Sequence, residues 1–101
     1  MKRFLIRYRL KHGSAEQRHG EMAAFIAALD GDPAFAGKIG YRCLKGKDGD
    51  YYHIVTAEDE ATQALQDRDF FKAYTAQTKT AAGGEVEVLP LELVAETRHR
   101  A

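Results

Sequence analysis

The chain has 101 residues, with 15 Lys and Arg against 15 Asp and Glu, so it is long enough for one domain with one core and carries no net charge. This balance argues against a broad basic surface for nucleic acid or an anionic membrane. The single cysteine, Cys43, allows no internal disulfide and fits a reducing cytoplasm, and we expect neither a signal peptide nor a spanning helix.

The first elements are a strand and a helix. Phe4 to Lys11 alternates apolar and polar residues, which predicts a half-buried strand. Ser14, with Gln17 three residues later, forms a capping box that opens a helix to about Leu29. This helix carries an apolar stripe with helical spacing.

A hairpin follows, from Lys38–Gly46 into Tyr51–Thr56. Asp48-Gly49 between two β-prone runs predicts a two-residue type I′ turn. That turn would place Lys45 opposite Tyr52 and Cys43 opposite Ile54.

The second half reads as two helical runs and a last strand. The segment 58–66 is helical, 67–69 breaks it, and a second run carries Phe70, Phe71 and Tyr74 before Gly83-Gly84. Glu85 to Glu96 then forms a strand that we expect to bend near Pro90.

The resulting order, β-α-β-β-α-β, predicts an α+β, ferredoxin-like fold with a four-stranded antiparallel sheet and two helices on one face. The helix-covered face would carry Phe4, Ile6, Tyr8, Tyr41, Cys43, Tyr52 and Ile54. The opposite face would carry Leu5, Arg7, Arg9, Arg42, Leu44, Tyr51, His53 and Val55. The second face is too apolar to leave in water, which predicts a homodimer.

The segment Ala61–Tyr74, with its Phe-Lys-Ala-Tyr end, and the final strand Val86–Val94 resemble the dimeric α+β barrel superfamily, in its antibiotic-biosynthesis-monooxygenase-like branch. The resemblance implies that residues 1–96 form one such domain, followed by a frayed tail over 97–101. It also implies a dimer with face-to-face sheets and a pocket between each sheet and its helices.

The chain departs from this family at polar positions. Leu65 stands where many members have a histidine, and Thr56 where many have a tryptophan. The haem-degrading branch uses Asn, Trp and His, but its Asn position falls on Ile6 and the sequence contains no Asn or Trp. Haem degradation by that triad is therefore excluded, and no cofactor is expected.

His19 is the candidate catalytic base, because imidazole titrates near working pH; the alternative is a rim histidine without a role. The candidate substrate-binding residues are Tyr8, Tyr41, Tyr52, Tyr74, Phe71 and Met22; the alternative is that aromatic residues at these spacings are ordinary core. Cys43 reads as a small buried hydrophobe. The histidines lack ligand spacing, so no metal site is expected.

The predicted dimer interface consists of Leu5, Arg7, Arg42, Leu44, His53 and Val55. His53 could form a pH-sensitive contact across this interface or simply a hydrogen bond within it. The arginines could bind an anion between subunits, or pair with the glutamates of the last strand.

Two functions stay open. One is a cofactor-independent monooxygenase acting on an aromatic or quinol-type molecule; the other is a non-catalytic module that binds a small ligand or is purely structural. RNA binding would need exposed aromatics on the central strands, and the first strand has none on its open face.

Overall fold

In a computed structural model of the chain, residues 1–98 are described. Four strands and three helices follow in the order β1 (Lys2–Arg9), α1 (Ala15–Asp30), β2 (Ile39–Lys45), β3 (Asp50–Ala57), α2 (Asp59–Gln66), α3 (Asp69–Ala81) and β4 (Glu87–Leu91). The sheet is antiparallel with the order β2-β3-β1-β4. This is the predicted ferredoxin-like α+β topology, with the helical region after β3 divided into two helices.

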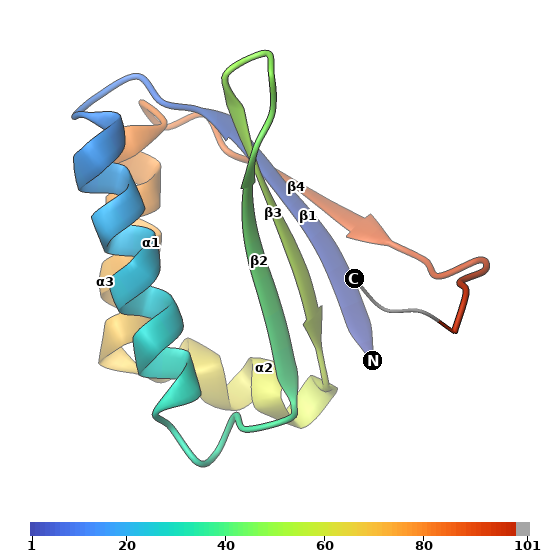
Figure 1. Cartoon of the computed structure of the whole chain (residues 1–101). Helices are drawn as coiled ribbons and strands as arrows, with labels where there is room; N and C mark the ends of the chain where they lie inside the picture. The colour runs from blue at the N-terminus through green and yellow to red at the C-terminus, as the bar shows by residue number, and fades with distance from the viewer. Residues whose placement is uncertain (99–101) are drawn as a thin grey trace.

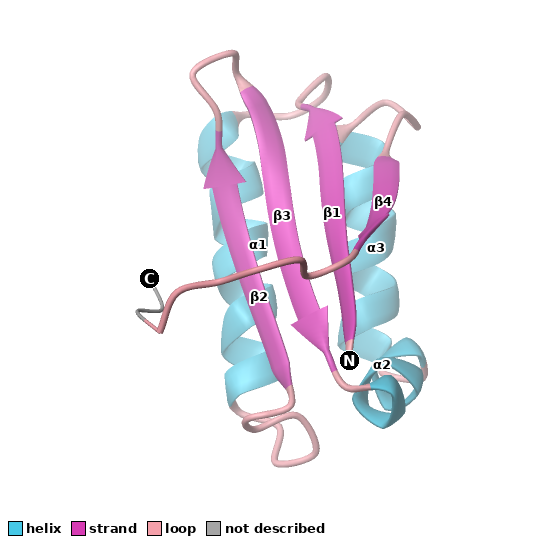
Figure 2. Ribbon diagram, turned by 90° about the vertical axis from the view of Figure 1, so that its right-hand side faces the viewer, coloured by secondary structure: helices cyan, strands magenta, loops and turns pink. Residues whose placement is uncertain are grey.

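The molecule has two layers. Helices α1 and α3 lie side by side over one face of the sheet, and α2 lies at the end of the strands where β3 leaves the sheet (Figure 1). Figure 2 shows the opposite face of the sheet, which none of the described helices covers; of the described residues, the segment after β4 crosses in front of it. The fold thus has a helix-covered face and an open face.

The helix boundaries follow the sequence signals. The Ser14 hydroxyl accepts a hydrogen bond from the Gln17 amide at 3.0 Å, which satisfies one free amide at the start of α1. Between α2 and α3, the amide of Arg68 turns back to the Leu65 carbonyl at 3.0 Å, and the chain leaves the helical path for only a few residues. The predicted break at 67–69 is therefore confirmed.

The predicted hairpin turn is wrong by one residue. The Gly46 amide donates to the Asp50 carbonyl at 2.8 Å, and the Gly49 amide donates to Gly46 at 3.1 Å, so the loop has three residues. Gly49 has φ +88°, whereas no described residue other than glycine has a positive φ, as a type I′ turn would require of Asp48. The Asp48 carboxylate instead accepts the Asp50 amide at 2.9 Å and stabilises the longer loop.

This one-residue difference reverses the two faces of β3. Cys43 lies opposite His53 and Tyr41 opposite Val55, so the placement of Tyr52 and Ile54 under the helices was wrong. Tyr51, His53 and Val55 are buried on the helix-covered face instead. The faces predicted for β1 and β2 are confirmed, with Leu5 on the open side and Tyr8 buried beneath the helices.

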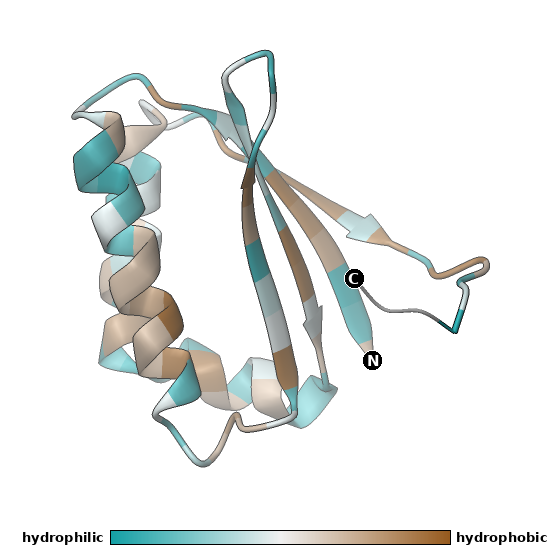
Figure 3. Cartoon of the chain, in the orientation of Figure 1, coloured by the Kyte–Doolittle hydropathy of each residue, from teal (hydrophilic) through white to brown (hydrophobic). Residues whose placement is uncertain are grey.

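The core lies between the sheet and the two long helices. Phe25 of α1 and Tyr74 of α3 stack with ring centroids 4.0 Å apart and planes within 3°. Apolar residues gather toward the α2 end of α1 and α3 and along the strands that face them (Figure 3). The same layer also contains buried polar side chains, among them Arg18 and His53.

The last strand is shorter than predicted. Pairing with β1 covers Arg3–Arg7 against Leu91–Glu87 and includes Pro90, which lies opposite Phe4 on the edge strand. Residues 92–97 have no regular structure, and residues 99–101 of the predicted tail lie outside the described part. Among the described residues, no helix is long and apolar enough to cross a membrane.

Candidate functional site: a cavity between sheet and helices

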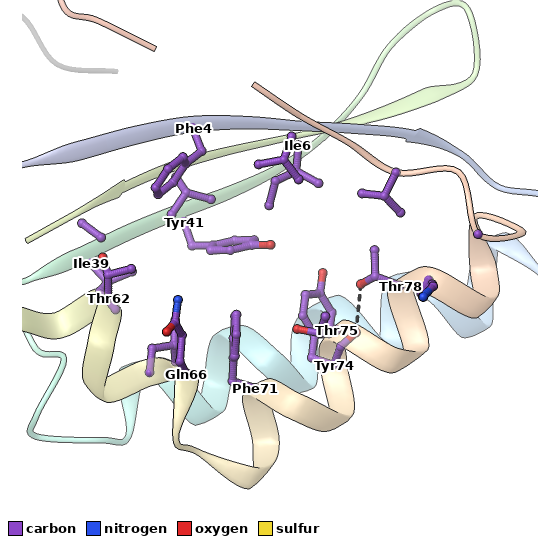
Figure 4. A pocket seen from close by; sticks show the side chains of 17 residues that line it. Phe4, Ile6, Ile39, Tyr41, Thr62, Gln66, Phe71, Tyr74, Thr75 and Thr78 are labelled. Atoms are coloured by element: carbon purple, nitrogen blue, oxygen red, sulfur yellow. Dashed lines mark hydrogen bonds between the residues drawn. The ribbon is translucent and has the colours of Figure 1, made fainter. Parts of the chain in front are cut away.

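A cavity of about 510 Å³ lies between the helix-covered face of the sheet and helices α2 and α3. Its walls are mostly apolar: Phe4 and Ile6 project from β1, and Phe71 faces them from α3 (Figure 4). This volume lies within the range of pockets that hold small organic molecules.

Polar groups are few and lie on defined walls of the cavity. Tyr41 extends from β2 across the cavity toward the side of Tyr74 and Thr78 (Figure 4). Gln66 and Thr75 contribute from the helices. Lys79 is the only charged residue of the lining, which includes no carboxylate and no imidazole among the described residues.

The structure brings together only part of the predicted binding set. Tyr41, Tyr74 and Phe71 line the cavity. Met22 belongs to the buried core, and Tyr8 lies behind the cavity wall. Tyr52 lies on the open face, where its hydroxyl donates to Asp48 at 2.6 Å, so its predicted position at the ligand was wrong.

His19 does not reach the cavity. It lies on an exposed part of α1, and its Nε2 is 2.8 Å from the Tyr51 hydroxyl. The cavity lining does not include it. A general base for a ligand in this cavity would therefore have to come from elsewhere.

His53 is fully buried behind the cavity, not on the open face where it was predicted. Its Nε2 lies 3.0 Å from the Tyr8 hydroxyl, and its Nδ1 lies 3.1 Å from the Tyr41 hydroxyl. Burial and the nearby Arg18 cation lower the pKa of His53 to about 4, so the imidazole is neutral at neutral pH.

Arg18 of α1 is also buried, with a side chain that is only 1% exposed, and it binds two tyrosine hydroxyls. Its Nε donates to the Tyr8 hydroxyl at 2.9 Å, and its Nη2 donates to Tyr74 at 3.1 Å and to Thr78 at 2.6 Å. The guanidinium also lies over the Tyr74 ring, 4.7 Å from its centroid. Glu21, 3.1 Å away, is its carboxylate partner.

The tyrosine hydroxyls of this group are held in their protonated form. Burial raises the pKa of Tyr8 to about 12 and raises the pKa values of Tyr41 and Tyr74 further, although the Arg18 cation opposes the shift. Burial likewise raises the pKa of the Cys43 thiol. These groups therefore act as neutral hydrogen-bonding partners at neutral pH.

Sequence reasoning missed Arg18 and misplaced His53, for different reasons. Arg18 begins the stripe that continues through Met22, Phe25 and Leu29, all buried on α1. A charged residue in phase with an apolar stripe was a usable signal that it needs buried partners. His53 was misplaced only because the hairpin loop was taken to be one residue too short.

Two arginines of the open face are engaged within the chain. Arg7 and Arg9 both bind the Asp50 carboxylate, at 2.9 and 2.7 Å. This pairing, and not the predicted glutamate pairing, occupies them. Among residues 1–98, no cluster of three His, Cys, Asp or Glu could hold a metal ion.

No protein-family model matches the sequence, and no curated protein is detectably similar to it. Solved structures do match. A crystal structure titled antibiotic biosynthesis monooxygenase superposes with a TM-score of 0.75 at 11% identity, covering 94% of this chain and 100% of that one. A variant of SnoaB, a cofactor-independent oxygenase from Streptomyces nogalater, gives 0.75 at 16% identity, with 97% of each chain covered.

A dimeric ferredoxin-like protein of unknown function from a Jannaschia species gives a TM-score of 0.68 at 16% identity, covering 91% of this chain and 98% of that one. At these identities the likeness concerns the backbone and not the site residues. The chain therefore has the fold of the antibiotic-biosynthesis-monooxygenase-like α+β proteins.

Proposed function

We propose that this protein binds a small aromatic or quinol-type molecule between its sheet and helices and acts on it as a cofactor-independent monooxygenase. The observation that carries the proposal is the apolar cavity of about 510 Å³, with the hydroxyls of Tyr41 and Tyr74 among its buried polar groups. An aromatic body would contact Phe4 and Phe71, and an oxygen substituent would meet the tyrosines.

The reaction class needs no electron source other than the substrate. An activated methylene loses a proton to give an enolate or phenolate, and this anion donates electrons to dioxygen and forms a carbon–oxygen bond. Loss of water from the resulting hydroperoxide leaves a carbonyl, so R₂CH₂ and O₂ give R₂C=O and H₂O. Hydroxyl donors at the substrate oxygen would stabilise the anion.

A second function is supported by a specific observation: none of the carboxylates or imidazoles of residues 1–98 lines the cavity. A proton would therefore have to leave through water or through Lys79 at the cavity wall. A cavity of this kind could hold its ligand without changing it, which is the non-catalytic alternative.

Oxygen uptake separates the two functions. An anthrone and a naphthoquinol would be incubated with the protein in an oxygen electrode, against the rate of spontaneous oxidation. A monooxygenase places one labelled atom of dioxygen in the product and one in water. Ligand binding without uptake above the spontaneous rate would contradict catalysis and favour the binding module.

We further propose that the protein works as a homodimer in the cytoplasm. The open face of the sheet carries exposed apolar side chains, among them Leu44, Ile54, Leu89 and Leu91. Leu5, Arg7 and Arg42 of the predicted interface lie on the same face. Two such faces packed together would remove this apolar surface from water.

A further inference from the structure

The buried polar group behind the cavity has a defined hydrogen-bond direction. A guanidinium can only donate, so the Tyr8 hydroxyl accepts from Arg18. The single proton of Tyr8 then goes to its other partner, Nε2 of His53. A buried hydroxyl proton without an acceptor would be costly, which makes this orientation the favourable one.

The donor and acceptor roles of Tyr8 also fix those of His53 and of Tyr41, which lines the cavity. A neutral His53 that accepts at Nε2 carries its proton on Nδ1 and donates it to the Tyr41 hydroxyl, 3.1 Å away. Tyr41 therefore receives a hydrogen bond from the protein, and its own proton is directed elsewhere. Tyr41 lines the cavity, where a ligand is the available acceptor.

The Tyr74 hydroxyl also receives a hydrogen bond from the protein, in this case directly from Arg18. Its hydroxyl accepts from Nη2 of Arg18 at 3.1 Å, so its own proton is also left over. The Tyr74 proton has acceptors within the protein, because the Tyr74 hydroxyl is hydrogen-bonded to Tyr41 and to the Cys43 thiol. With Tyr74 donating inside the protein, the Tyr41 proton is the O–H donor that is left for a bound molecule.

Within the described part of the chain, no negatively charged group acts on these hydroxyls. The titratable groups that act on Tyr41 and Tyr74 are Tyr8, Cys43 and Arg18, from β1, β2 and α1, together with His53 from β3. Lys79 lies in the lining, and Glu21, the one carboxylate of the group, lies beyond Arg18. The cavity end is thus neutral to positive.

We infer that Arg18 and His53 act as positioning residues that turn Tyr41 into an obligate donor, so that the cavity selects an aromatic ligand by an acceptor oxygen, with a phenolate or enolate preferred over the neutral form. The inference rests on the proposed ligand site. It adds a specificity: the same cavity should discriminate between two rings of equal shape that differ only in that oxygen.

The test compares pentafluorophenol, which is largely ionised at neutral pH, with pentafluorobenzene, which has the same ring without the oxygen. A charge-assisted hydrogen bond contributes enough for a preference of about tenfold to a hundredfold in Kd for the phenolate. Tyr41→Phe should remove most of this preference and leave the affinity for pentafluorobenzene unchanged. Tyr52→Phe, on the open face, is the matched control and should retain the preference.

The positioning role of His53 is tested separately, by the preference for the phenolate in two variants at this position. A glutamine at position 53 can accept from Tyr8 and donate to Tyr41, so His53→Gln should retain the preference for the phenolate. His53→Leu should reduce it at least threefold while pentafluorobenzene still binds. A preference unchanged in His53→Leu would overturn the role of His53.

The remaining outcomes distinguish this inference from the proposed function. If neither probe binds the wild-type protein, the ligand site itself is wrong and the inference fails with it. If both probes bind the wild-type protein equally, the ligand site stands and the donor assignment is overturned.

Discussion

His53 links the stability of the protein to pH. It is completely buried with both ring nitrogens engaged by tyrosines, and its pKa is lowered to about 4 from an ordinary value near 6.5. As pH falls below about 6.5, His53 binds a proton in the unfolded chain but stays unprotonated in the folded protein. The stability contributed by neutral His53 is thus complete above pH 6.5 and declines as pH falls toward 4.

We predict that unfolding by urea will show this loss. Between pH 7 and pH 5 the free energy of unfolding should fall by about 2 kcal/mol through this residue alone. His53→Gln, which cannot titrate, should show a decline smaller by that amount. Equal declines in the two proteins would mean that His53 is accessible to protons in the folded state.

At the scale of elements, the hairpin loop decides which side chains reach the site. Its three-residue form depends on Gly49, whose φ of +88° is strained for any residue with a Cβ. Gly20, in the middle of α1, has helical geometry and no atom within 4 Å of an added Cβ. An added Cβ at Gly49 is equally free of contacts, so the two glycines differ only in backbone conformation.

We predict opposite effects of one substitution at these two positions. Gly49→Ala should lower the free energy of unfolding by about 1 kcal/mol, because alanine resists a positive φ. Gly20→Ala should raise it by about 0.5–1 kcal/mol, because alanine is the better helix former. Denaturant unfolding of both variants tests this, and stabilisation by Gly49→Ala would contradict the loop geometry.

The length of this loop separates the features that could be predicted from the sequence from those that could not. Alternation in β1, the Ser14 cap and the apolar stripe of α1 identified the elements and their order, because these signals are local. The register of β3 depends on whether two or three residues form the loop, and Asp48-Gly49 is compatible with both. Tyr41 and Tyr74 line the cavity, and the positions predicted for them did not depend on that choice.

The Arg18 network could not have been predicted in the same way. It joins side chains from β1, β2, β3, α1 and α3, and apart from Arg18 and Glu21 the partners that join different elements are 10 to 60 residues apart in sequence. Only the packed layers bring them together. The exposed position of His19 follows from the geometry of α1 itself. His19 precedes the buried Met22 by three residues, but it lies at the side of the helix, beside Tyr51.

At the scale of the whole molecule, the open face of the sheet should hold two copies together. We predict that Ile54→Lys, at a central position paired with Leu5 and Arg42, will shift a dimer toward monomer in sedimentation equilibrium. Ala73→Lys, on an exposed part of α3, is the control and should leave the dimer intact. A wild-type protein that sediments as a monomer at the same concentration would contradict the dimer.

The cavity between the sheet and the helices is the feature on which the proposed function depends most. Calorimetric titration with 1-naphthol tests this directly, in the wild-type protein and in Thr75→Trp, where the larger side chain would fill the cavity from α3. We predict saturable binding with a negative heat-capacity change in the wild type, and an affinity at least about tenfold lower in Thr75→Trp. Ala73→Trp, outside the lining, should bind as the wild type does. No binding to the wild type, or equal binding to Thr75→Trp, would contradict the account.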